Sequence, residues 1–298
     1  MRGRTAVSIG TNRERLVQVA VVGQVAPQEF ESGWSTPYLI SHDGIPRIVP
    51  GTGGITYNVR VGDRIAGLVG DHIEPAVSAR NPDPKANGGF NVLSCVGNEA
   101  TVVSGDAKGA RGVVTGTHGG IEHVMIDFAD DVLTKLVVGD QIQVKSWGVG
   151  LQIDDFPEIR CTGLDPDLFA TWITRATDGK LDVPVAKMAP AAIMGSGLGR
   201  DNVTRGDYDI TLFDPAMVEQ YGLDDLRFGD FVAIMDADAS FGRHYYAGAV
   251  SIGIIVHGDS FMAGHGPGVT GLLTSHTGQI RPVLDSGANI AQLLSLRT

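Results

Sequence analysis

Short runs of β-branched residues recur along the chain, and glycine-containing turns separate them. Such residues favour strands, because branched side chains pack well on a pleated surface. We therefore expect strands at residues 16–25, 100–105, 112–116, 123–128 and 249–257. After the last of these runs the sequence changes abruptly to histidine, aspartate and glycine, a change that marks either an irregular turn or a site.

Three segments repeat one pattern, in which an apolar approach is followed by Gly-Asp and then by alternating apolar and polar residues. They span residues 59–72, 136–148 and 226–238. Glycine allows a positive φ, and aspartate can accept hydrogen bonds from backbone amides where the chain reverses. A single Gly-Asp pair is also common in simple hairpins, but three copies followed by similar strands predict barrel-like sheets.

Helices are fewer. Residues 165–176 and 214–223 both open with Asp-Pro, where aspartate can cap free amides and proline fits the first turn. Residues 288–297 have the pattern of a closing amphipathic helix. The sequence therefore predicts a β-dominated α+β fold, with barrel-like antiparallel or mixed sheets, Gly-Asp turns and a few short helices.

Length and composition indicate two domains. A chain of 298 residues with 43% hydrophobic and 19% charged residues can bury a sizeable core. We expect an N-terminal β-rich domain over residues 1–155 and a C-terminal α+β domain over residues 156–298, with the boundary within residues 151–166.

Charge and cysteine content exclude several classes of protein. The net charge is −11 and no basic run is present, so nucleic acid is not an expected partner. Cys95 and Cys161 show no CxxC spacing, which argues against a disulfide framework or a thiolate zinc site. No run of 18 apolar residues occurs, so a membrane is not an expected partner either. We expect a cytoplasmic protein.

Three short pairs place two possible metal ligands, a histidine with a carboxylate or two carboxylates, two residues apart, a spacing that puts both on one face of a strand. The pairs are His72 with Glu74, Asp236 with Asp238, and His257 with Asp259. Imidazole and carboxylate are ligands of divalent zinc or manganese, the cofactor that we expect. The predicted metal ligands are His72, Glu74, Asp236, Asp238 and His257. Structural ion pairs would bring the same residue types together, and residues 236–240 also fit a solvated turn.

Two further histidines are candidates for proton transfer. His118 lies between a threonine and two glycines, and His265 lies within a glycine-rich segment. An unperturbed imidazole has a pKa of about 6.5 and can act as an acid or a base near neutrality. The same ring can also simply bond to a nearby carbonyl. His123 begins an apolar strand and is expected to be an edge residue.

Two glycine-rich loops, residues 194–200 and 263–268, are expected to line a small-molecule site. Glycine amides can converge on an anion, and an arginine can meet a carboxylate through two hydrogen bonds. The predicted substrate-binding residues are Gly195, Gly197, Arg200, Arg205 and Gly266. Plain tight turns are the alternative. The G-x-S-x-G, H-E-x-x-H and GxxxxGK[ST] motifs are missing from the sequence, which removes the usual support for a serine hydrolase, a zincin or a nucleoside triphosphatase.

Four stretches resemble an uncharacterised prokaryotic family of unknown function: GDHIEPAVSAR, MGSGLG, RGDYDI and residues 245–275, which contain GHGPG. This resemblance identifies relatives and implies no reaction. A fainter similarity, through residues 81–91 and HGDSFMAGHGPG, is to the acetamidase/formamidase group of β-rich enzymes. That group has a QGDGE-type loop where this chain has GHGPG.

Two functional hypotheses follow. The first is a metal-dependent hydrolase of a small amide or cyclic amide, in which some of the predicted ligands hold the ion and His118 moves protons. The second is a non-catalytic protein that binds a small ligand or serves as a structural homo-oligomer. In both, a small molecule is the expected partner and a homo-oligomer is the expected assembly.

Overall fold

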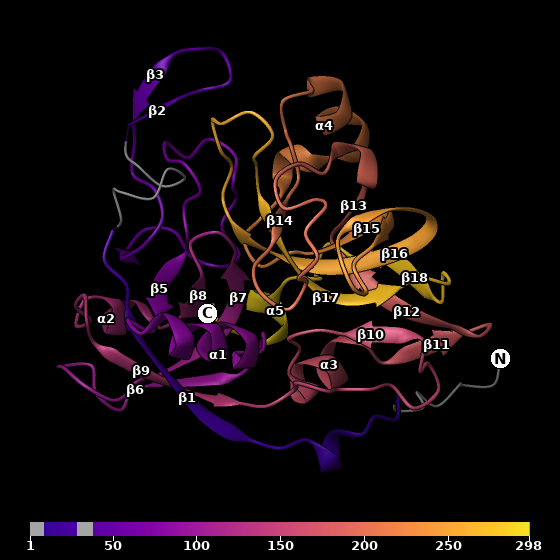
Figure 1. The fold of residues 1–298 in the computed structure, drawn as a ribbon, viewed down its shortest axis with the longest axis horizontal. Coiled ribbons are helices and arrows are strands. Elements are labelled where there is room, and N and C mark those ends of the chain that lie inside the picture. The colour runs from indigo at the N-terminus through magenta and orange to yellow at the C-terminus, as the bar shows by residue number, and fades with distance from the viewer. Residues whose placement is uncertain (1–8, 29–37, 298) are drawn as a thin grey trace.

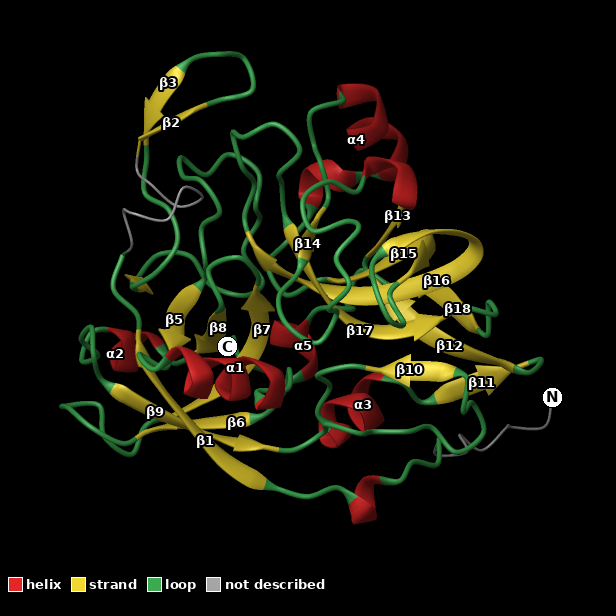
Figure 2. Ribbon diagram, in the orientation of Figure 1, coloured by secondary structure: helices red, strands yellow, loops and turns green. Residues whose placement is uncertain are grey.

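The computed structural model describes residues 9–28 and 38–297, and strands account for most of its regular structure (Figure 2). Six antiparallel strands close into a barrel, because β1 pairs with β9 on one side and with β5 on the other. Around the barrel the order is β1 (Val19–Val25), β9 (Gln141–Ser146), β6 (Glu99–Val102), β7 (Arg111–His118), β8 (His123–Asp127) and β5 (Ala76–Arg80). The short β4 (Ile55–Thr56) extends the sheet beyond β5.

The barrel interior follows from the period of two in its strands. In β9 the isoleucine and valine side chains are buried while the intervening glutamines and lysine are exposed. The core inside the barrel includes Val77, Val114, Ile126 and Val144, all inaccessible to solvent. Phe90 belongs to the same core and lies against Gly23, where a Cβ would come within 2.6 Å of its ring.

A second, mixed sheet is built from the later part of the chain. Its path is β10 (Ile159–Cys161), β17 (Gly268–Ser275), β16 (His244–His257), β15 (Phe231–Asp238) and β13 (Lys187–Pro190), and β14 (Tyr208–Asp209) pairs with β17. Only the β13–β15 pair is parallel in this sheet. The apolar run of β16 is buried from Ala249 onward, as a strand covered on both faces requires.

Smaller sheets complete the fold. Three strands, β11 (Arg175–Thr177), β12 (Lys180–Val185) and β18 (Ile280–Leu284), form one sheet. A hairpin of β2 (Tyr38–Ile40) and β3 (Pro46–Ile48) projects from the body of the molecule in Figure 1. Together these sheets and short helices confirm the predicted β-dominated α+β class.

The helices are α1 (Pro84–Leu93), α2 (Asp130–Leu133), α3 (Pro166–Trp172), α4 (Pro215–Tyr221) and α5 (Ile290–Leu293). Asp165 and Asp214 cap α3 and α4 as expected. The closing helix is only four residues long, with Asn289 as its cap, so the expected span of 288–297 is wrong. α1 escaped prediction because two glycines and two asparagines in its ten residues are poor helix formers.

All three Gly-Asp turns have the expected geometry. Their glycines have φ values of 80° to 94°, and each aspartate accepts a hydrogen bond from the amide three residues earlier. A strand follows the second and third turns but not the first. The backbone after Gly62 instead bonds to the third Gly-Asp segment, where the Ile65 amide donates to the carbonyl of Leu226.

The barrel and the second sheet meet at β7, which packs against β16 and β17 near the centre of Figure 1. The Thr117 amide donates to Thr270 Oγ1, and that hydroxyl donates back to the Thr117 carbonyl. At Gly116 a Cβ would lie 2.0 Å from Val256, so glycine is what allows this close contact. The domain boundary near residue 155 stays a prediction. In the described part of the chain, no helix has the length and apolar character needed to cross a membrane.

Candidate metal centre

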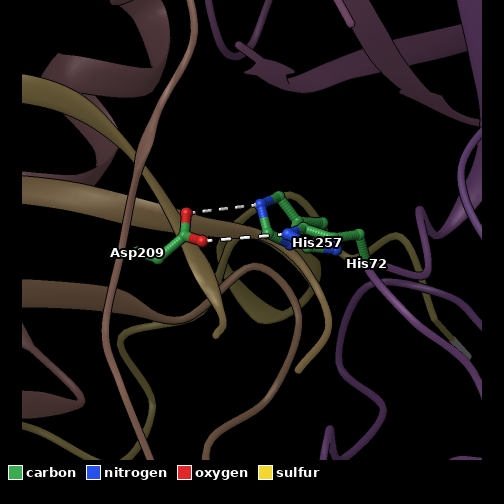
Figure 3. Close-up of side chains that lie close together, drawn as sticks. All are labelled: His72, Asp209 and His257. Atoms are coloured by element: carbon green, nitrogen blue, oxygen red, sulfur yellow. Dashed lines mark ion pairs between the residues drawn. The ribbon is translucent and has the colours of Figure 1, made fainter. Parts of the chain in front are cut away.

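Several strand ends meet at the junction of the two sheets. His118 is the last residue of β7 and His257 the last of β16, while Asp209 lies in β14. A β-bulge precedes His257, which then pairs with Gly268 at the start of β17. His72 joins them from the loop before β5. Figure 3 shows His72 and His257 turned towards Asp209.

Three buried imidazoles at this junction share one feature: the Nδ1 of each ring is bonded to an oxygen acceptor. The pairs are His72 with Asp71 at 2.7 Å, His118 with Glu74 at 2.6 Å, and His257 with the Gly258 carbonyl at 2.9 Å. An acceptor at Nδ1 holds the proton there and leaves Nε2 as the nitrogen that can bind a cation. Metal-binding histidines in proteins are usually oriented in this way.

Two aspartates face these rings. His257 Nε2 lies 2.7 Å from Asp207 Oδ2 and 3.7 Å from Asp209 Oδ1, and His72 Nε2 lies 3.8 Å from Asp209 Oδ2. Despite their short separation, His257 Nε2 and Asp207 Oδ2 are not aligned for a hydrogen bond, and neither buried atom has another partner in the described residues. Two lone pairs therefore share one buried space, an arrangement that a cation satisfies.

The donors form two overlapping groups of three, and within each group the ligand atoms lie within 4.8 Å of one another. One group is His72, Asp209 and His257, and the other is His118, Asp207 and His257. Ligands about 2.1 Å from a tetrahedral ion lie about 3.4 Å apart, and the separations from His257 Nε2 to the two aspartates, 2.7 Å and 3.7 Å, lie on either side of that value. Three imidazoles with two carboxylates are a donor set for zinc or manganese.

Charges within the site perturb its titration. Burial alone would lower the pKa of His72, but its interactions with the Asp209 and Asp71 carboxylates raise it to about 10. For Asp209, burial is outweighed by its interactions with the nearby imidazoles, those of His265 and His72 first, and its pKa is lowered. A cation that binds here therefore competes with a proton on His72.

His72 also has unusual backbone geometry. Its φ is 51°, in the left-handed region that non-glycine residues rarely adopt. Such strain persists where surrounding contacts hold it, and it is common at functional sites. The expectation that His72 and Glu74 share a strand face is wrong, because residues 71–75 form no strand.

Glu74 is buried and surrounded by hydrogen-bond donors, and it contacts the Nδ1 side of the His118 ring. It accepts hydrogen bonds from His118 Nδ1, His123 Nδ1, the Gly53 amide and Ser78. Burial would raise the pKa of Glu74, but the charge of His123 and hydrogen bonds from both imidazoles hold it well below its usual range. With its oxygens engaged in this way, Glu74 orients His118 and is not placed as a ligand.

Asp236 and Asp238 lie elsewhere. Asp238 pairs with His244 at one end of β16, whereas His257 is at the other end of that strand. The two aspartates do not share a face, because β15 is bulged between Met235 and Ala237 and Asp236 has a φ of 58°. Asp236 accepts the Gly248 amide, and Asp238 accepts from Ser240 and His276.

Sequence reasoning missed Asp207 and Asp209. They form the same D-x-D spacing as Asp236 and Asp238, within the RGDYDI stretch that carried the family resemblance. No apolar strand precedes them, and β14 is only two residues long, so the signal used for the other pairs was missing. Asp259, the partner expected for His257, bonds instead to the Ser260 amide.

The cluster forms one wall of a cavity of about 230 Å³. His72, His118, Asp207, Asp209 and His265 line it together with the predicted Gly197, Arg200 and Arg205. His265 Nδ1 lies 3.1 Å from His72 Nε2 and 3.2 Å from Asp209 Oδ2.

The glycines of both loops allow close contact between backbone segments. A Cβ would lie 2.1 Å from the Gly264 carbonyl at Gly195 and 1.9 Å from the Ile210 carbonyl at Gly266. Their amides are already engaged with Asp209, since Gly195 donates to its carbonyl and Gly266 to its carboxylate. These two glycines therefore shape the wall, and their amides do not point to a ligand.

Comparison with known proteins places the chain in a family. Models of the N-terminal and C-terminal domains of unknown function DUF4438 match residues 38–170 and 171–294. The crystal structure of TM1086 is similar over 96% of this chain and 99% of that chain, with 45% sequence identity and a TM-score of 0.90. No curated protein matches, and the similarity to acetamidases and formamidases stays a prediction. The chain therefore belongs to the DUF4438 family, as the resemblance to a family of unknown function predicted.

Proposed function

We propose that this protein is a metal-dependent hydrolase of a small amide or cyclic amide. The observation that carries the proposal is the set of three imidazoles, each held at Nδ1, that converge on two aspartates, with His257 Nε2 and Asp207 Oδ2 buried without a hydrogen-bond partner in the described residues. A cavity opens directly beside them. Perturbed titratable groups in a cavity are typical of catalytic sites.

The residues that would hold the ion are His72, His118, His257, Asp207 and Asp209. Zinc or manganese in this position would supply a Lewis acid that polarises a carbonyl and activates water. The chain itself contributes the orientation of the donors, through Asp71, Glu74 and the Gly258 carbonyl.

We assign proton transfer to His265. It lines the cavity, and its Nδ1 is held by Asp209 at 3.2 Å, which fixes the ring. Amide hydrolysis needs a proton on the leaving nitrogen, and a histidine within reach of the substrate can deliver it. His118 was expected to do this, but its hydrogen bond to Glu74 and its place beside His257 make it a better ligand.

The cavity limits the size of the substrate. Sites for drug-sized ligands are about 300–1,000 Å³, whereas this cavity is about 230 Å³. A substrate of few atoms fits, in agreement with a small amide.

Metal content and chelation test the proposal. We expect untagged protein to contain zinc or manganese at about one ion per chain, and we expect chelator treatment to abolish hydrolysis of small linear and cyclic amides until that metal is restored. Elemental analysis measures the metal content, and an assay of released ammonia or amine measures the hydrolysis. Bound metal without turnover would support the alternative of a non-catalytic ligand-binding protein, and protein without metal that ignores chelator would contradict the metal site itself.

Replacing Glu74 with glutamine should weaken metal binding by about 10- to 100-fold, the usual effect of losing a partner that orients a ligand. A glutamine can accept from one imidazole, but its amide group opposes the other N–H. Competition with a chromophoric chelator measures the affinity. Glu122→Gln is the control, because Glu122 lines the same cavity but pairs with Arg205. Equal affinities for the two variants would show that Glu74 does not orient the site.

A further inference from the structure

Two arginines on the cavity wall, Arg200 and Arg243, form no ion pair with a carboxylate in the described part of the chain. Their backbones are directly paired, since the Arg243 amide donates to the Arg200 carbonyl at 2.8 Å and the Gly199 amide donates to the Arg243 carbonyl at 2.6 Å. Two positive side chains are thus held on one short stretch of wall. Like charges held together in this way favour an anion between or beside them.

Arg243 is deeply buried, with only 3% of its surface exposed, so its charge needs compensation from within the protein. Its Nη1 donates to the Asp207 carbonyl at 2.7 Å and its Nη2 to the Gly206 carbonyl at 3.1 Å. Carbonyl oxygens satisfy the N–H groups but carry no net charge, so the buried positive charge has no direct counterion.

Arg205, the third arginine of the wall, is already neutralised. Its Nη2 lies 2.7 Å from Glu122 Oε2, and its Nε also donates to that oxygen. The remaining acids of the wall, Asp207 and Asp209, face imidazoles. Arg200 and Arg243 are therefore the two arginines of the wall that no carboxylate contacts within the described residues.

We propose that Arg200 and Arg243 bind a carboxylate group of the substrate, so that the substrate is a small amide that also carries a carboxylate. The amide half of this statement rests on the proposed hydrolase function, but carboxylate binding does not. A carboxylate fits better than a phosphate, because both terminal nitrogens of Arg243 already donate to carbonyls. Arg200 is left as the one guanidinium of this pair whose planar fork can meet two oxygens.

Calorimetric titration of N-acetylglycine, with N-acetylglycinamide as its neutral counterpart and inorganic phosphate as a second anion, tests the inference at constant ionic strength. We expect wild-type protein to prefer N-acetylglycine, and we expect Arg200→Gln to weaken its binding by about tenfold or more while the neutral amide is unaffected. Arg111→Gln is the control. Arg111, the first residue of β7, is exposed, pairs with Glu99 and does not line the cavity. No preference for the acid in wild-type protein, a preference that survives in Arg200→Gln, or tighter binding of phosphate would each overturn the assignment.

The same titration on chelator-treated protein separates this inference from the metal centre. If the preference for N-acetylglycine still depends on Arg200 in chelator-treated protein, the carboxylate site is supported even where metal analysis contradicts the proposed hydrolase. If metal binds as proposed but the preference is missing, the carboxylate site alone is wrong.

Discussion

Gly268→Ala is expected to yield a folded protein that no longer binds metal at the proposed centre. A Cβ on Gly268 would lie 2.0 Å from Asp207 Oδ2 and 2.2 Å from His257 Nε2. Real Cβ atoms do not approach other atoms so closely, and both neighbours are buried, so the two donors must separate. We expect metal affinity to fall by at least about 100-fold, by analogy with the loss of ligand orientation, and stability to fall by about 1–3 kcal/mol from overpacking.

Gly271→Ala is a closely matched control. It lies in the same strand, β17, and a Cβ there would meet no atom within 4 Å. Elemental analysis and thermal unfolding of the two variants give the comparison. If both retain metal to the same extent, the buried space between Asp207 and His257 is not where the ion binds.

His257→Ala should have the largest effect on the metal centre. His257 is the residue common to both groups of donors, so its loss leaves neither group complete. We expect bound metal to fall to about a tenth or less of the wild-type content, because a site normally needs three or four protein ligands. Truncating this fully buried side chain should also lower the unfolding free energy of the metal-free protein by about 2–5 kcal/mol, because it leaves a cavity.

His276→Ala is the control variant for His257→Ala. His276 pairs with Asp238 at 3.0 Å, and its side chain is 46% exposed, so it removes an imidazole–carboxylate contact away from the cavity. Metal content and denaturant unfolding should match the wild type in this variant. Wild-type metal content in His257→Ala would rule out the proposed centre.

Local rules predicted much of the fold. The alternation in β9 and the caps of α3 and α4 depend on neighbouring residues alone, and a single chain is enough to recognise them. The closure of β1 onto β5 depends on a pairing far along the chain, which no local pattern specifies. The strand expected after Gly62 failed for the same reason, because its backbone is bonded near Leu226.

The site was predictable only in part. His72, His118, His257 and His265 stood out because histidine is rare and each lies beside glycine or an acid, and the structure brings all four together. Asp236 and Asp238 were misplaced because a bulge breaks the strand parity on which their selection rested. Asp207 and Asp209 were missed because only tertiary contacts, not their own sequence neighbourhood, bring them to the imidazoles.

The contact between Thr117 and Thr270 links the barrel to the second sheet beside this cluster. His72 and His118 come from the first of the two matched family domains, whereas Asp207, Asp209 and His257 come from the second. Each domain alone would therefore present an incomplete coordination shell. The proposed metal centre depends on both regions, so a relative that lost or exchanged either one would lack part of the donor set.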